Sequence, residues 1–155
     1  MNVADILSPS DVFCGLKAGN KRKLLQDLAA IVGSRVGLDG AVIFEALWER
    51  EKLASTAVGR GVAIPHGRLP RLERIVGVFA RLQTAIDFDA PDDVPVDLVF
   101  LLLTPAEAGA DHLKALARVS RLLRHAGTCE QLRAATSADA LYALLTEPPA
   151  GSRAA

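Results

Sequence analysis

Residues Leu98 to Leu103 form the longest unbroken aliphatic and aromatic run in the chain. The run is far shorter than the ~20 apolar residues that a membrane-spanning helix requires. With its neighbours it forms a strand candidate over 96–104 that is apolar on both faces, as a strand in the middle of a covered sheet should be. This segment therefore predicts a central strand with helices packed on either side.

Helix signals lie on both sides of this strand in the sequence. Apolar residues recur at helical spacing after residues that can cap or begin a helix. The expected helices are one over 21–35 capped by Asn20, one from Asp39 to about residue 52, one from Thr104-Pro105 to about His125, and one capped by Ser137 that runs to Leu145.

Other segments supply further strand candidates. Residues 75–82 have a strand pattern, and three glycines and two prolines in 55–70 predict strand fragments joined by a loop of fixed shape. The first 15 residues are turn-prone and are expected to be a short lead-in, and residues 147–155 a disordered tail. Helices alternating with strands imply one layered α/β (α+β) domain with a sheet between helices.

The chain has 155 residues, with 18 basic and 18 acidic side chains and a formal net charge of zero. It lacks the basic excess that nucleic-acid binding normally shows, so no nucleic acid is expected as a partner. Cys14 and Cys129 are too few and too far apart for a disulfide framework or a cysteine-based zinc site. No signal peptide or membrane insertion is indicated, and we expect a cytoplasmic protein.

The zero net charge hides two oppositely charged windows. Residues 50–74 contain six basic residues and two acids, a local charge of +4, whereas residues 83–112 contain seven acids and no Lys or Arg. Either window can be a solvated face. Alternatively, the acidic window docks a basic patch on a partner protein.

His66 is the strongest candidate for a reactive side chain. It lies in the basic window between Pro65, which restricts the backbone, and Gly67, which removes bulk. A neutral imidazole is a nucleophile that forms covalent intermediates without a metal. Nearby glycine N–H groups and the guanidinium groups of Arg50, Arg60 and Arg68 suit a phosphoryl group, so the pattern favours a phosphohistidine site.

The other two histidines differ in their surroundings. His112 falls in the first turns of the long helix and could point across the end of the sheet, whereas His125 stands at a helix end, where a partial positive charge is favourable. Two facing histidines could bind zinc, but no Cys or His at ligand spacing completes a site, so neither a metal nor any other cofactor is expected. Serine hydrolase and nucleotide-binding motifs are also missing from the sequence.

Several ordered blocks of the sequence form a pattern known from one protein family. They are Arg50-Glu51-Lys52-Leu53, Ser55-Thr56, Gly61-Val62-Ala63-Ile64-Pro65-His66-Gly67, Phe88-Asp89-Ala90, Pro95-Val96-Asp97-Leu98 and Asp111-His112-Leu113. Over about residues 3–146, a single domain, they resemble the type 2 IIA proteins of the bacterial phosphoenolpyruvate-dependent phosphotransferase system, in the fructose/mannitol/nitrogen class. Within that class the chain is most similar to the nitrogen-regulatory IIA proteins.

The resemblance implies a mixed β-sheet flanked by helices on both faces, and a phosphotransferase component that acts mainly in regulation. It implies that His66 accepts a phosphoryl group from a small histidine phosphocarrier of the HPr type, supported by Arg50 and His112. The resemblance also implies regulatory protein targets of the kind found in this family, such as potassium transporters or sensor kinases. The residues expected to surround the phosphate are Ser55, Thr56, Gly61, Gly67 and Arg68.

Two departures from the family pattern stand close to His66 in the sequence. Arg60 stands where relatives often carry asparagine, and Ala54 replaces a frequent glycine. We expect Arg60 to add a charge near the site. Three alternatives stay open: a sugar-specific IIA component that passes phosphate to a IIB domain or permease, a binding module that has lost phosphotransfer, and a metal-dependent hydrolase.

Overall fold

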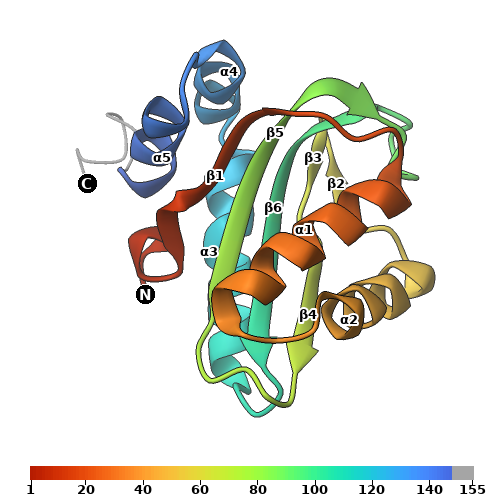
Figure 1. Ribbon diagram of the computed structural model, residues 1–155. Coiled ribbons are helices and arrows are strands. Elements are labelled where there is room, and N and C mark those ends of the chain that lie inside the picture. Colours follow the sequence, from red (N-terminus) through yellow and green to blue (C-terminus); the bar gives the residue numbers. More distant parts are fainter. Residues whose placement is uncertain (148–155) are drawn as a thin grey trace.

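The computed structural model describes residues 1–147 and is built around one six-stranded mixed β-sheet (Figure 1). The strand order is β1-β5-β6-β3-β2, and β4 also pairs with β6. The strands are β1 (Leu7–Leu16), β2 (Ala57–Gly59), β3 (Val62–Ala63), β4 (His66–Leu69), β5 (Val76–Ile86) and β6 (Val96–Pro105). The helices are the 3-10 turn η1 (Val3–Asp5), α1 (Lys21–Val36), α2 (Gly40–Leu53), α3 (Ala110–Arg124), α4 (Ala126–Ala134) and α5 (Ala138–Thr146).

The central strand β6 is buried on both faces, as its sequence predicts. Every residue from Leu98 to Leu103 is fully buried. Successive side chains of a strand point to opposite faces, so alternate residues of β6 enter two separate cores. Antiparallel β5 flanks β6 along one edge, and β3 and β4 run parallel to it along the other.

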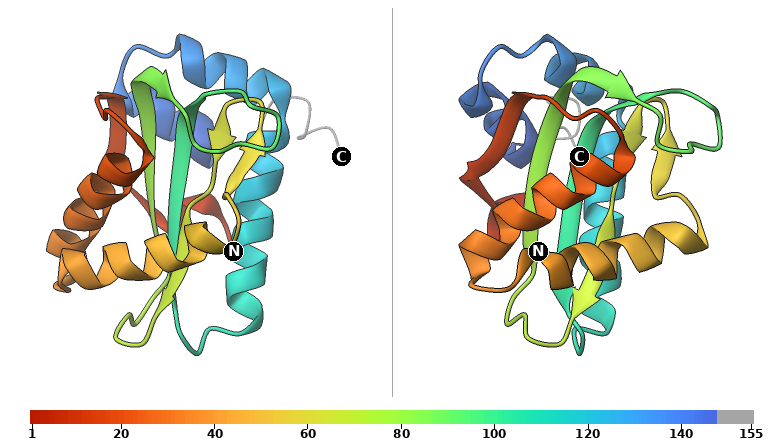
Figure 2. Two further views of the ribbon diagram at one scale, coloured as in Figure 1. Left: turned by 90° about the vertical axis from the view of Figure 1, so that its right-hand side faces the viewer. Right: turned by 45° about the vertical axis from the view of Figure 1, so that its right-hand side comes forward.

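Helices cover both faces of the sheet (Figures 1 and 2). The first core joins α1 and α2 to one face, and the second joins η1, α3, α4 and α5 to the other. This arrangement confirms the predicted α/β sandwich with a mixed sheet. No helix in the described part of the chain combines the length and the hydropathy needed to cross a membrane.

The predicted helix starts at Asn20, Asp39 and Ser137 are confirmed by their capping hydrogen bonds. The side chains accept the backbone N–H groups of Lys23, Ala41 and Ala140, respectively. Such bonds satisfy N–H groups that have no partner inside the helix.

The structure corrects the sequence-based prediction at three elements. Residues 7–16 form β1, an edge strand, where we expected a lead-in. The long helix begins at Ala110 rather than at Thr104-Pro105, because β6 continues to Pro105. The helix α4 was not predicted. Apart from Glu147, the tail expected over 147–155 lies outside the described residues.

Strands β3 and β4 together form one interrupted strand, and His66 is the first residue after the interruption. Val62 pairs with Leu98 and His66 with Leu102, so the register to β6 is the same in both pieces. The interruption falls at Ile64-Pro65, where the Pro65 carbonyl accepts the Leu102 N–H. His66 is therefore the first residue of β4, a strand at an edge of the sheet that contacts α2, and its ring faces His112 of α3.

Candidate functional site

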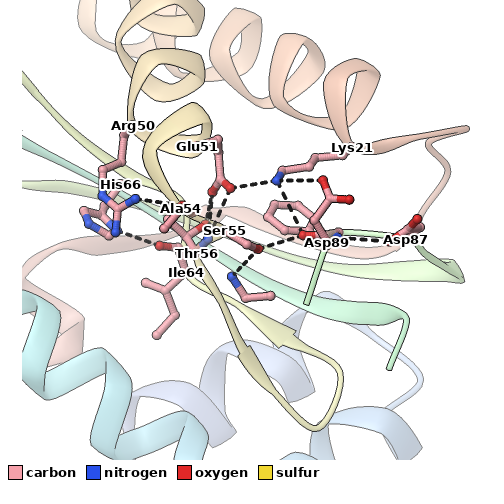
Figure 3. Close-up of polar contacts among 12 residues, drawn as sticks. Lys21, Arg50, Glu51, Ala54, Ser55, Thr56, Ile64, His66, Asp87 and Asp89 are labelled. Atoms are coloured by element: carbon pink, nitrogen blue, oxygen red, sulfur yellow. Dashed lines mark hydrogen bonds and ion pairs between the residues drawn. The ribbon is translucent and has the colours of Figure 1, made fainter. Parts of the chain in front are cut away.

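His66 is half-buried, and one of its ring nitrogens is already engaged. Its Nδ1 lies 2.8 Å from the Ile64 carbonyl oxygen, two residues earlier in the chain (Figure 3). A carbonyl oxygen only accepts hydrogen bonds, so this contact places the proton of a neutral ring on Nδ1. The lone pair then resides on Nε2, which is the nitrogen available as a nucleophile.

The surroundings of His66 favour its neutral form. Burial lowers the pKa of the imidazole, the charge of Arg50 lowers it further, and the Ile64 hydrogen bond and Glu51 oppose this shift. Desolvation disfavours a charged group and a nearby cation disfavours a second one. The lowered pKa of His66 therefore favours the uncharged imidazole.

His112 faces His66 from the first turn of α3. The two ring centroids are 5.8 Å apart and the ring planes are inclined by 54°. His112 is 7% exposed, and its Nδ1 lies 2.6 Å from the Thr104 hydroxyl at the end of β6. Burial, followed by the charges of Arg68 and His66, lowers the pKa of His112. The predicted meeting of a helix histidine with the end of the sheet is therefore observed.

Arg50 approaches His66 from the last turn of α2 (Figure 3). Its Nη1 donates a 2.8 Å hydrogen bond to the Ala54 carbonyl, which holds the guanidinium beside the imidazole. Ala54 itself has an extended backbone with φ of −170°, a conformation that any residue adopts. The alanine in place of a common family glycine therefore causes no strain here.

Of the other expected phosphate neighbours, Arg68 lies on the same side of β4 as His66, whereas the remaining residues face or contact other parts of the fold. Arg68 is exposed on β4 and stands on the same strand face as His66, two residues on. Gly67 faces the opposite way, toward Ala46 of α2. Ser55 donates to the Phe88 carbonyl at 2.7 Å, which ties the segment after α2 to the loop between β5 and β6.

Thr56 and Gly61 are engaged elsewhere in the fold. Thr56 is buried, and both its N–H and its hydroxyl donate to the carboxylate of Glu51. Gly61 lies in the turn between β2 and β3, packed against Asp97 and Arg133. The structure thus brings Arg50, His112 and Arg68 to His66, and it places Thr56 and Gly61 against other partners.

Arg60 does not add a charge beside His66, and that expectation is wrong. Its guanidinium donates to the Arg124 carbonyl at the C-terminal end of α3, whereas His112 lies at the N-terminal end. Arg60 also has a φ of 58°, in the left-handed region that asparagine tolerates better than most residues. An asparagine would therefore be less strained than arginine at this position.

His125 also has a different role from the expected one. It stands between α3 and α4, and its Nδ1 accepts the Thr128 N–H at 3.1 Å, which caps α4. The ring nitrogen acts here as an acceptor at a helix N-terminus rather than as a positive charge at a C-terminus.

Four of the seven acidic side chains of window 83–112 make contacts within the protein, among them Asp87 with the Asp89 N–H. Asp89 pairs with Lys21, Asp92 accepts the Arg60 N–H, and Asp97 pairs with Arg133. These contacts give part of the window a structural role. Within residues 1–147, no three His, Cys, Asp or Glu side chains gather closely enough to hold a metal ion.

Sequence reasoning missed one pair, Glu51 and Lys21. Glu51 is buried, Lys21 is largely buried, and their side chains form a 2.9 Å ion pair. A signal was present, because Glu51 falls in the last turn of one helix and Lys21 in the first turn of another. The helix dipole disfavours an acid and a base at those respective ends, so each residue needs a specific partner.

Comparisons with known proteins agree with this geometry. The family model described as "Phosphoenolpyruvate-dependent sugar phosphotransferase system, EIIA 2" matches residues 5–147. A "Nitrogen regulatory protein" of Bradyrhizobium diazoefficiens is 53% identical over 97% of this chain and 98% of its own length. A "PTS system fructose-specific EIIA component" of Haloferax volcanii is 41% identical over 81% of this chain and 80% of its own.

A solved structure extends the likeness to three dimensions. The crystal structure of nitrogen regulatory protein IIA-Ntr from Neisseria meningitidis is 36% identical, covers 93% of this chain and 99% of that chain, and superposes with a TM-score of 0.89. Sequence and fold therefore lead to the same set of relatives.

Proposed function

The chain belongs to the EIIA 2 family of the phosphoenolpyruvate-dependent sugar phosphotransferase system, and on this premise we propose that His66 accepts a phosphoryl group from a small HPr-type histidine phosphocarrier. The observation that carries the proposal is the bond between His66 Nδ1 and the Ile64 carbonyl. It leaves a neutral imidazole with its Nε2 lone pair free to react.

The proposed transfer needs no proton movement at His66. Nε2 attacks the phosphorus of the carrier's phosphohistidine in line, the new N–P bond forms as the carrier's N–P bond breaks, and the carrier imidazole leaves with the bonding electron pair. The acceptor ring keeps its Nδ1 proton and becomes formally cationic. The Ile64 carbonyl, 2.8 Å away, stabilises that charge through the hydrogen bond.

Charged neighbours of His66 suit the transferred group. Phosphoryl transfer depends mostly on positioning and on electrostatic stabilisation of the equatorial oxygens. Arg50 and Arg68 supply guanidinium groups, and His112 supplies a second imidazole within the first turn of α3, where the helix dipole favours an anion.

The role that we propose for this transfer is regulation. Relatives with this domain over nearly their whole length carry the name nitrogen regulatory protein. A phosphoryl group adds roughly −1.5 to −2 charges, enough to make or break a protein interface. The free and phosphorylated forms would then bind different targets, in the cytoplasm, where two free thiols such as Cys14 and Cys129 stay reduced.

A labelling experiment tests the proposal. The protein is incubated with labelled phosphoenolpyruvate and the upstream enzyme and phosphocarrier of its own phosphotransferase system. We expect one acid-labile label per chain, located on His66 Nε2, and no label on His66→Ala. Label retained on that variant at the same stoichiometry would refute the proposal.

The second candidate is a sugar-specific IIA component that passes the group to a IIB domain. The observation that supports this second candidate is the 41% identity with a fructose-specific EIIA component. Both candidates predict the same labelling of His66. Transfer of the label onward to a IIB domain and then to sugar distinguishes the sugar-specific role from the regulatory one.

A further inference from the structure

Glu51 is a buried carboxylate that the proposed transfer does not use. It is 6% exposed, next to Arg50 in the sequence but directed into the protein (Figure 3). One oxygen receives the Thr56 hydroxyl, and the other lies 3.1 Å from the Thr56 N–H and 2.9 Å from Lys21 Nζ. The Lys21 side chain is itself only 11% exposed.

A continuous chain of hydrogen bonds leads from Glu51 to His66. Glu51 holds Thr56, and the Thr56 carbonyl accepts the Ile64 N–H at 3.0 Å. The Ile64 carbonyl in turn accepts from His66 Nδ1 at 2.8 Å. Ile64, whose carbonyl selects the His66 tautomer, lies in the gap between β3 and β4. Ile64 is outside the residues that pair with β6, and its N–H is held by Thr56 instead.

Burying this ion pair has a cost that its own attraction does not clearly offset. Removing two charges from water costs several kcal/mol per ion, and apolar replacements of such pairs are often equally stable or more stable. Lys21 and Glu51 also occupy helix ends that the dipole disfavours. Stability alone is therefore a weak account of the pair, and its placement at the start of the chain of bonds to His66 supplies a better one.

We propose that Glu51, neutralised by Lys21, is a positioning residue for phosphoryl transfer: through Thr56 and Ile64 it holds the His66 ring with its proton on Nδ1 and Nε2 free. This inference rests on the proposed function of His66. A histidine without such a fixed carbonyl samples both tautomers, and only one of them presents a lone pair at Nε2.

The central test variant is Lys21→Met with Glu51→Met, which replaces the buried pair by apolar side chains of similar length. The His66 tautomer is read in the unphosphorylated protein from two-bond 1H–15N NMR correlations. The wild type should have the proton on Nδ1, and the variant a mixture of tautomers. Ile64 amide exchange should accelerate, and the phosphorylation rate should fall roughly tenfold or more, because misplaced reacting groups lose orientation.

Two comparisons separate positioning from a structural role. Lys21→Met with Glu51→Gln keeps an acceptor oxygen for Thr56, so it should restore the Nδ1 proton and most of the rate. Asp97→Asn with Arg133→Met removes a different ion pair, which joins β6 to α4. This control should leave the tautomer and the rate unchanged.

Each outcome of the test has a defined meaning. A folded Met/Met variant that keeps the Nδ1 tautomer, or one that changes tautomer without losing rate, overturns the inference. If that variant does not fold, Thr56→Val and Thr56→Ser replace it: a loss of rate and of tautomer purity with valine, rescued by serine, supports the inference, and unchanged values overturn it. A wild type that accepts no phosphoryl group refutes the proposed function, whereas the tautomer measurement still decides whether Glu51 positions the ring.

Discussion

The imidazole rings of His66 and His112 lie with their centroids 5.8 Å apart, one on an edge strand and the other on a helix that begins 44 positions later in the sequence. Each ring has one nitrogen bound inside the protein, His66 to the Ile64 carbonyl and His112 to the Thr104 hydroxyl. Each ring therefore has one nitrogen, Nε2, outside these two hydrogen bonds. Two such rings cannot both become cationic without mutual repulsion, which links their titration to stability.

The first prediction concerns the pH dependence of stability. Burial is the main cause of the lowered pKa of both histidines, so below the ordinary value of 6.5 the unfolded chain binds protons there that the folded protein does not. The free energy of unfolding should then decrease as the pH falls from about 7.5 through 6.5 and toward the folded-state pKa values. Denaturant titrations should show a shallower decrease for His66→Asn with His112→Asn. An unchanged decrease in that variant would contradict the prediction.

Much of this fold follows from local patterns in the sequence. The apolar run in β6 correctly indicated a strand covered on both faces, and three capping residues correctly marked helix starts. These features depend on neighbours within a few residues. The prediction of β1 failed because Ser8-Pro9-Ser10 is typical of a turn, yet an edge strand tolerates proline, and the pairing with β5 shifts register between Leu7 and Val12.

The site was predicted less evenly than the fold. His66 stands out because its Pro and Gly neighbours are unusual. Arg50 and His112 were candidates from the basic window and from the helix pattern, but their supporting role came from the family resemblance, and α2 and α3 place them beside His66. The contact of Lys21 with Glu51 joins residues 30 positions apart and depends on how α1 packs on α2. No local pattern encodes such a contact. The same limit applies to Arg60, which lies in a backbone turn and whose guanidinium contacts the C-terminal end of α3.

The second prediction concerns Arg60 and its left-handed backbone. Arg60→Asn should leave the phosphorylation rate within about twofold of the wild type, because the guanidinium lies at the opposite end of α3 from His112. Arg60→Val should destabilise the protein by about 1–2 kcal/mol, since a β-branched residue is strained at a φ of 58°. Denaturation and labelling rates measured on the same samples test both statements. A large loss of phosphorylation in Arg60→Asn would show that the charge does reach the site.

The third prediction assigns the two arginines to different histidines. Burial is the leading cause of the lowered pKa at both rings. At His66 the hydrogen bond to Ile64 opposes this shift, and the charge of Arg50 lowers the pKa further. At His112 the second cause is the charge of Arg68. Removing a nearby cation makes an imidazole easier to protonate. Arg50→Met should therefore raise the pKa of His66, and Arg68→Met that of His112, in an NMR titration.

The same variants should differ in phosphotransfer. Arg50→Met should slow phosphorylation by roughly 10²-fold, the usual loss when one preorganised donor to a developing anion is removed. Arg50→Lys keeps the charge but loses the planar fork, so it should recover only part of the rate. Lys52→Met is the matched control, because Lys52 is exposed on the same helix turn and pairs with Glu49. Equal losses in Arg50→Met and Lys52→Met would mean that general charge around α2, rather than the placed guanidinium, supports the transfer.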